Sequence, residues 1–187
     1  MTSRNSQRSN PSAALQHWIA LSMRHSLLAW TVVIAMTGCG SSGETRMDHK
    51  SRLVDRINRS GKVNDPKTPS PLVTLEEFFE GNDDPASIGC NLPGAVQPVE
   101  MFVLYKAVRA RSEVAEVLVQ VTMHDDPEGW PFSDTVWVIT SASDADIRRW
   151  IPERLQPDEL FDGFHRDRPM EAYSVPKGMR AVGLWYD

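Results

Sequence analysis

The chain has 187 residues, of which 41% are hydrophobic and 24% are charged, so it can hold one globular domain with extensions or two small domains. Residues 1–43 contain three arginines and no acid, residues 44–70 contain seven basic and four acidic side chains, and residues 71–187 contain ten basic and 21 acidic ones. A region as acidic as residues 71–187 repels phosphate backbones, so we expect no nucleic-acid partner. The two cysteines, Cys39 and Cys90, are too few for a disulfide framework or a zinc site.

The longest uncharged apolar segment is LLAWTVVIAM, residues 27–36. Ten helical residues extend about 15 Å, roughly half of the hydrocarbon thickness of a bilayer, so this segment is too short for a stable membrane span. Arg24 precedes it and no acid follows before Glu44, which is typical of a secretory signal.

The end of this segment, MTGC at residues 36–39, resembles the lipobox of bacterial lipoprotein signal peptides, in which two small residues precede a cysteine that becomes acylated. The resemblance implies a lipid on Cys39, attachment to a membrane through that lipid, and a location in the cell envelope. A start at Met23 would give a compact signal peptide. Two alternatives stay open: the apolar segment could be a buried core helix, or translation could start at Met47 and give a cytoplasmic protein.

The chain therefore divides into three expected regions: a leader at residues 1–38, a flexible polar tether at residues 39–71, and an acidic domain at residues 72–187. The tether prediction rests on composition, because the segment is rich in Gly, Ser, Lys and Pro. Such a segment has too few apolar side chains to order itself. Its positive charge could also favour an anionic membrane surface.

The first element predicted in the domain is a short helix within VTLEEFFEG, residues 73–81. Thr74 and Glu77 have the spacing of a capping box, and Gly81 suits a left-handed C-terminal stop. A turn-rich loop follows, and the next helix begins near Pro98. Its apolar stripe repeats at spacings of three and four residues: Met101, Leu104, Tyr105 and Val108.

Two strands come next, at residues 116–123 and 134–140, joined by a loop of ten residues. Ser143 can cap a third helix that ends at Pro152, and residues 178–187 predict a last strand. The order α-α-β-β-α-β predicts an α+β domain with a small, mostly antiparallel three-stranded sheet and helices packed on one face. We expect the last strand to lie beside the first strand of the hairpin.

Carboxylates gather in the loop between the two strands. Calcium and similar divalent cations prefer several hard oxygens from a flexible loop, so these residues are candidate cation ligands or a candidate acid–base pair. The set is Asp125, Asp126, Glu128 and Asp134. Their spacing does not match an EF-hand, and turn formation or solvation explains such side chains equally well. No cofactor is predicted beyond this candidate cation.

The same loop, WPFSDTVW at residues 130–137, combines aromatic and acidic side chains that could recognise a basic or sugar-like partner. The candidate contact residues are Trp130, Phe132, Asp83 and Asp84. The alternative is that Trp130 plugs its own loop. Cys90 could act as a nucleophile with His124 or His165, although a free cysteine is more often a small buried hydrophobe.

The segments LEEFFEGNDDPASIGCNL and WPFSDTVWVITSAS resemble a small, uncharacterised group of bacterial domains over about residues 72–187. The resemblance implies a compact, acidic domain of this length, and it transfers no activity and no catalytic residue. Members of this group generally lack an export signal, so residues 23–39 are a departure from it.

The leading hypothesis is a lipid-anchored envelope protein whose acidic α+β domain binds a protein or a small molecule, and we expect a binding module rather than an enzyme. One alternative is a small metal-assisted hydrolase that uses the loop carboxylates. Another is a cytoplasmic interaction or immunity-type module expressed from Met47.

Overall fold

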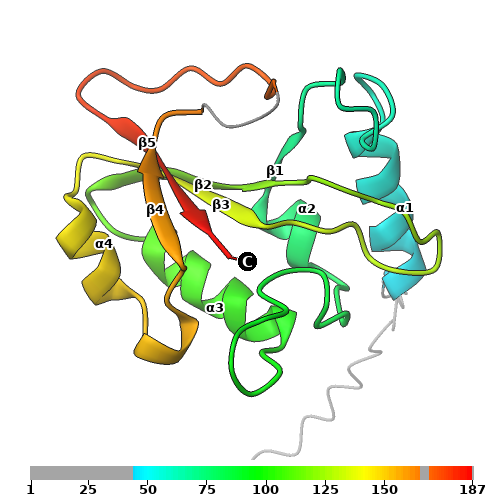
Figure 1. Cartoon of the computed structure of the whole chain (residues 1–187), viewed down its shortest axis with the longest axis horizontal. Coiled ribbons are helices and arrows are strands. Elements are labelled where there is room, and N and C mark those ends of the chain that lie inside the picture. The colour runs from blue at the N-terminus through cyan, green and yellow to red at the C-terminus, as the bar shows by residue number, and fades with distance from the viewer. Residues whose placement is uncertain (1–43, 165–168, 187) are drawn as a thin grey trace, which may run out of the picture. The chain divides into compact units, whose positions relative to one another are not determined.

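The computed structural model describes residues 44–164 and 169–186 (Figure 1). The leader, Cys39 and the first residues of the expected tether lie outside this part of the chain. The described elements are, in chain order, α1 (Arg46–Ile57), β1 (Leu72–Thr74), α2 (Leu75–Phe79), α3 (Pro98–Arg109), β2 (Val114–Gln120), β3 (Thr135–Thr140), α4 (Asp144–Trp150), the 3-10 helix η1 (Glu153–Leu155), β4 (Glu159–Asp162) and β5 (Arg180–Trp185). Within this part of the chain, no helix is long and apolar enough to cross a bilayer.

Helix α1 lies where the sequence predicted a flexible tether. Thr45 caps it in a capping box, because its hydroxyl accepts a hydrogen bond from the Asp48 N–H and the Asp48 carboxylate accepts one from the Thr45 N–H. Leu53 and Ile57, one helical turn apart, are buried in the core of the domain. The tether prediction is therefore wrong for residues 44–71, since a few apolar side chains suffice to hold a helix when the rest of the domain provides the surface that they pack against.

The sheet has five strands in the order β1-β2-β3-β5-β4, and all neighbours are antiparallel. The α+β class is confirmed, but the sheet is larger than the predicted three strands. The last strand, β5, pairs with β3 and not with the first hairpin strand, so the predicted placement is wrong. The position beside β2 is taken by β1, which has three residues and is too short to show an alternating pattern.

All four α-helices pack on one face of the sheet, as predicted, and α2, α3 and α4 lie below it in Figure 1. Side chains from each helix are buried in the core on this face: Leu53 and Ile57 from α1, Leu75, Phe78 and Phe79 from α2, Met101, Tyr105 and Val108 from α3, and Ile147 from α4. The opposite face carries a smaller apolar cluster around Trp137, which the irregular segment before β5 covers with half-buried Met170, Tyr173 and Val175.

The outer edge of β1 is covered by side chains and not by another strand. Arg56 of α1 donates to the Leu72 carbonyl at 2.9 Å, and the Leu72 N–H donates to Glu171 at 3.2 Å. Arg56 and Glu171 also form two hydrogen bonds with each other, of 2.7 and 3.1 Å. This pair joins α1 to the segment before β5. It also hydrogen-bonds the Leu72 N–H and carbonyl groups, which would be unpaired at an open sheet edge.

Candidate functional site

A hollow of about 520 Å³ lies next to the C-terminal end of α1. The loop that follows α1 supplies most of its wall, and the loop between β2 and β3 supplies the rest. The lining residues are Asn58, Gly61, Lys62, Val63, Asn64 and His124. A volume of this size lies within the usual range for small-molecule sites.

Two asparagines hold the wall of the hollow in place. The Asn58 side chain donates to the Val54 carbonyl at 2.9 Å and accepts from the Val63 N–H at 3.3 Å. The Asn64 side chain pairs with the backbone of His124, accepting from its N–H at 2.8 Å and donating to its carbonyl at 2.9 Å. Both side-chain amides are therefore hydrogen-bonded within the domain, and that of Asn64 fixes the two loops to each other.

His124 lines the hollow and carries an unsatisfied polar atom that is buried away from solvent. Its Nε2 atom is buried and has no hydrogen-bond partner among the described residues. Burial and the nearby Lys50 ammonium lower the pKa of His124, while Asp126 and Asp125 act in the opposite direction. The imidazole is therefore neutral at pH 7, and its buried nitrogen lacks a bond whose absence costs about 1–3 kcal/mol.

Lys50 fastens the same loop to α1. Its side chain is only 5% exposed, and its ammonium donates to the Pro127 carbonyl. A lysine buried to this degree needs such a partner, because an unpaired ammonium out of water is costly. The position of the β2–β3 loop relative to α1 is thus set by the contacts of Lys50 and Asn64.

The loop after α1 also carries cations that the fold does not use. Arg59, Lys62 and Lys67 are exposed, and their side chains make no hydrogen bond or ion pair with the residues that the structure describes. By contrast, arginines within or at the start of α1 are paired: Arg46 with Asp83, Arg52 with Glu44 and Arg56 with Glu171. Of these three cations, Lys62 lines the hollow.

Three of the four loop carboxylates that were candidate metal ligands accept a hydrogen bond within the domain. Asp125 accepts from Asn64 at 2.8 Å, Asp126 accepts from the Glu128 N–H at 2.9 Å, and Asp134 accepts from the Thr135 hydroxyl at 2.8 Å. Over residues 44–164 and 169–186, no group of three or more His, Cys, Asp or Glu side chains is gathered so as to hold a metal ion. The structure therefore does not bring these four residues together as a ligand set.

The predicted contact residues have different positions. Trp130 is only 4% exposed, and its indole N–H donates to the Phe78 carbonyl at 2.9 Å, so the prediction of an exposed contact at the loop tip is wrong for this residue. Phe132 is half-buried. The Asp84 carboxylate accepts from the backbone N–H groups of Ala86 and Trp130, whereas exposed Asp83 pairs with Arg46.

Cys90 is exposed and free. The hydrogen bonds and charged neighbours of His124 come from Asn64, Lys50, Asp125 and Asp126, and Cys90 is not among them. His165 lies outside the described residues. No cysteine–histidine pair is formed within the part of the chain that the structure describes.

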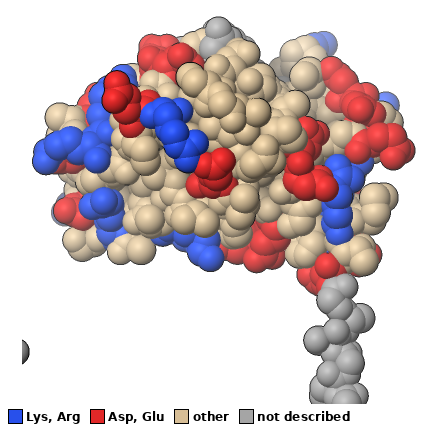
Figure 2. Space-filling model, turned by 90° about the horizontal axis from the view of Figure 1, so that it is seen from below, with Lys and Arg blue, Asp and Glu red and all other residues tan. Residues whose placement is uncertain are grey.

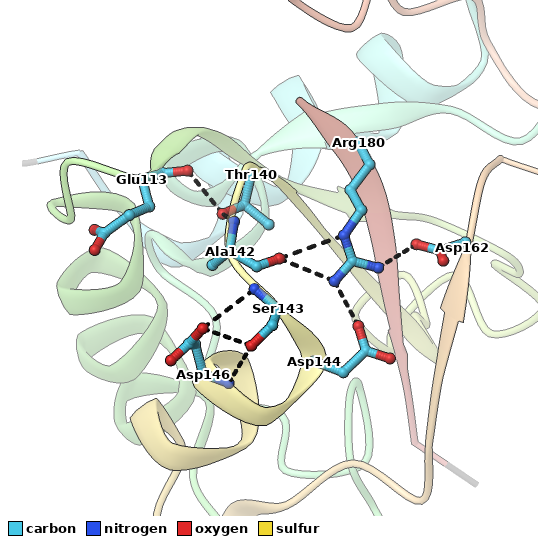
Figure 3. Close-up of polar contacts among 8 residues, drawn as sticks. All are labelled: Glu113, Thr140, Ala142, Ser143, Asp144, Asp146, Asp162 and Arg180. Atoms are coloured by element: carbon cyan, nitrogen blue, oxygen red, sulfur yellow. Dashed lines mark hydrogen bonds and ion pairs between the residues drawn. The ribbon is translucent and has the colours of Figure 1, made fainter. Parts of the chain in front are cut away.

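A second polar cluster, centred on Arg180, joins four elements of the fold (Figure 3). The Arg180 guanidinium donates to the Ala142 carbonyl at 2.9 Å and pairs with Asp144 and Asp162. The end of β3, the start of α4, β4 and β5 thus meet at one side chain. Because every donor shown is directed at a partner within the domain, we assign this cluster a structural role.

Sequence reasoning missed the hollow. Its wall was assigned to a tether, and His124 was considered only as a partner for Cys90. The available signal was the close spacing of Asn58, Gly61 and Asn64, which predicts ordered turns as well as it predicts a linker. Only the approach of the β2–β3 loop shows that these residues share a wall with a histidine.

The fold is that of a small acidic α+β domain with a five-stranded antiparallel sheet, and this domain carries the hollow. Residues 48–184 match the family model described as Uncharacterized protein YfbO family, and the chain belongs to this family. It is 40% identical over 136 residues to Uncharacterized protein YfbO of Escherichia coli (strain K12), a match that covers 73% of this chain and 96% of that protein. No solved structure was found to match the chain.

Proposed function

We propose that this chain is a lipid-anchored envelope protein, attached to a membrane through Cys39, whose acidic domain is a binding module with its ligand site at the hollow. The MTGC motif supports the anchor. The observation that carries the binding role is the hollow itself, whose walls are held by hydrogen-bonded asparagines and which is lined by Lys62, a lysine without an ion-pair partner among the described residues.

The position where the domain begins supports the anchor over a cytoplasmic start at Met47. Thr45 caps α1, and Glu44 accepts two hydrogen bonds from Arg52, of 2.7 and 2.8 Å. Residues before Met47 therefore contribute contacts to the folded domain. A protein translated from Met47 would lack the cap and this ion pair.

The revised start of the domain also shortens the link to the membrane. Only five residues separate Cys39 from Thr45. The Cα atoms of Cys39 and Thr45 are therefore at most about 20 Å apart when the chain between them is fully extended. An acylated Cys39 would therefore hold the domain close to the lipid headgroups. This differs from the tether of about thirty residues that the composition suggested, and it limits the partners to those that reach the membrane surface.

The family match and the proposed anchor concern different parts of the chain, since the family model covers residues 48–184. Because the match covers 96% of the Escherichia coli protein, little of that protein remains to correspond to residues 1–43 of this chain. The binding role is accordingly proposed for the shared domain, and the lipid anchor is proposed for this chain alone.

The anchor is tested by expressing the full chain in a bacterium that processes lipoproteins and measuring its intact mass and membrane association. We expect a mature chain that starts at an acylated Cys39, and no acylation in Cys39→Ala. The matched control is Cys90→Ala, which removes the exposed cysteine of the domain and should be processed like the wild type. An unmodified wild-type chain that starts at Met23 or Met47 would refute the anchor.

A further inference from the structure

We infer that the outer face of α3, formed by Val99 and Val103 and bordered by Lys106 and Arg111, lies against an anionic phospholipid surface. The valines would sit among the lipid headgroups, and the two cations would meet lipid phosphates. This inference rests on the proposed lipid anchor and adds the orientation of the anchored domain. The anchor and the orientation can be measured separately on the same samples.

Helix α3 has an apolar face that the domain leaves uncovered. Its inner side is buried through Met101, Tyr105 and Val108. Val99 and Val103, one turn apart, are 58% and 64% exposed. Two of the four large hydrophobic side chains that are exposed in the described part of the chain are thus neighbours on one helix. Single exposed apolar side chains are common, whereas adjacent ones on an ordered element indicate a contact surface.

The segment around these valines is almost free of charge. Between Asp84 and Lys106 the sequence contains one charged side chain, Glu100, although 24% of the chain is charged. Glu100 pairs with Arg154, so its charge is offset within the domain. The loop that leads into α3 adds exposed, uncharged residues at positions 93–95. A surface without unpaired charges loses little hydration when it enters the interface of a membrane.

Two cations border this surface without an acidic partner. The Lys106 Nζ atom lies 4.9 Å from the centroid of the Phe102 ring, and the Arg111 guanidinium carbon lies 4.6 Å from that of the Trp150 ring. Neither cation forms an ion pair with a residue that the structure describes. Long basic side chains next to aromatic rings and an apolar face are typical of helices in a membrane interface, where the cation reaches a phosphate.

The distribution of charge favours an anionic surface as the occupant. Residues 71–187 are acidic overall, but Figure 2, which views the helical side of the domain, shows most of the basic side chains in view gathered toward the α4 end, beside a broad uncharged surface. Glu76, an acidic residue close to Lys106, is paired with Arg109. An anionic membrane offers both an apolar layer for the valines and phosphates for the cations.

The proposed anchor brings this side of the domain to the membrane. The described chain begins at the lower end of α1 in Figure 1, on the side of the sheet where α2, α3 and α4 lie. An acylated Cys39, at most about 20 Å from Thr45, would keep that side next to the lipid. The contact can then be weak and still be occupied, because the anchor supplies a high effective concentration. The hollow, next to the other end of α1, would stay open to solvent.

The test uses the full chain, acylated in a bacterial host and reconstituted into vesicles of phosphatidylcholine with phosphatidylglycerol. A fluorescent dye is attached at Ala107→Cys, an exposed position one turn after Val103, in the Cys90→Ala background. The matched control carries the dye at Lys177→Cys, an exposed position in the segment that covers the opposite face of the sheet. Lipids with a quencher in their acyl chains should quench the dye at position 107 about threefold more than the dye at position 177.

Two double variants separate the apolar contact from the charge. Val99→Ser with Val103→Ser should remove most of the quenching at position 107, and because both side chains are exposed the fold should be kept, as thermal unfolding can verify. Lys106→Gln with Arg111→Gln should reduce the quenching about threefold in vesicles that contain phosphatidylglycerol. The same pair should also remove the difference between these vesicles and pure phosphatidylcholine vesicles.

The control for charge is Arg59→Gln with Lys62→Gln, which removes two exposed, unpaired cations from the loop after α1 and should leave the quenching unchanged. An equal loss in this control pair would overturn the inference, because it would show a general effect of charge. Equal quenching at positions 107 and 177, or none at either, would also overturn it. Self-quenching of the dye at position 107 in detergent would replace the lipid surface with a second copy of the chain.

The intact mass of the same samples measures the anchor independently. An acylated Cys39 without preferential quenching at position 107 would refute the orientation alone. Preferential quenching at position 107 in a chain without acylation would refute the anchor alone, because the contact with the vesicle would then form without the attached lipid.

Discussion

Tyr105 of α3 and Tyr186, which follows β5, form a hydrogen-bonded pair in the core on the helical face of the sheet. Tyr186 also donates to the Leu155 carbonyl at 3.3 Å, so its single proton is used there and Tyr105 donates to Tyr186. Burial raises the pKa of both phenols, which therefore stay protonated. The pair ties the end of the sheet to α3 and η1.

The direction of these bonds predicts unequal effects of two similar substitutions. Tyr105→Phe removes a donor and leaves Tyr186 bonded to Leu155, whereas Tyr186→Phe leaves the buried Tyr105 hydroxyl without an acceptor. We expect Tyr186→Phe to lower the free energy of unfolding by about 1 kcal/mol more than Tyr105→Phe, because an unsatisfied buried donor bears the full desolvation cost. Urea unfolding of both variants at pH 7 measures this difference, and equal losses would contradict the assigned direction.

At the scale of elements, the Arg56–Glu171 pair decides how α1, β1 and the segment before β5 are joined. Burial opposes ionisation of Glu171, but the hydrogen bonds from Arg56 and from the Leu72 N–H outweigh it and lower the pKa of the carboxyl. Each side chain is 20% exposed, so solvent screens the pair only in part. The pair connects residues 115 positions apart, which a helix–sheet pattern alone does not predict.

Glu171→Gln should destabilise the domain by about 1–2 kcal/mol at pH 7, because it removes the charge while keeping the size. A carboxyl whose pKa is lowered by folding contributes stability that is present above its unfolded pKa, about 4.3, and is lost as the pH falls through the folded value. The difference between wild type and Glu171→Gln should therefore shrink toward zero in acid. Unfolding curves at a series of pH values test this, and a constant difference would show that the charge is not the cause.

At the scale of the whole molecule, the domain includes Glu44 and Thr45, well before the start near Leu72 that the sequence predicted. Helix α1 packs against the core, Lys50 and Asn64 bind the β2–β3 loop, and Arg56 covers the edge of β1. The segment expected to be a tether therefore builds one side of the domain and most of the wall of the hollow.

A chain that starts at Met47 should be about 1–2 kcal/mol less stable than one that starts at Glu44. The loss comes mainly from the Thr45 cap, because the exposed Glu44–Arg52 pair is worth little in water. Thermal unfolding of the two truncated chains measures it. If the Met47 chain is equally stable, the contacts before Met47 do not support the domain and the argument against a cytoplasmic start fails.

The local sequence predicted several elements correctly because their signals lie within a few residues. The capping box of Thr74 and Glu77, the cap at Ser143 and the first-turn Pro98 all stand where expected. Side chains alternate along β2, with Val117 and Val119 in the main core and Leu118 on the other face. The candidate site could not be predicted in this way, since Lys62 and His124 are brought together by contacts between distant loops.

The sequence by itself determined the α+β class, the caps, the central hairpin and the resemblance of MTGC to a lipoprotein signal, because each depends on spacing within one short segment. Only the tertiary structure decided that β1 and β4 extend the sheet, that α1 belongs to the domain, and that Trp130 is buried. Strands of three or four residues and a sparsely apolar helix carry too little local pattern to be recognised, and they become stable only where the rest of the chain buries them.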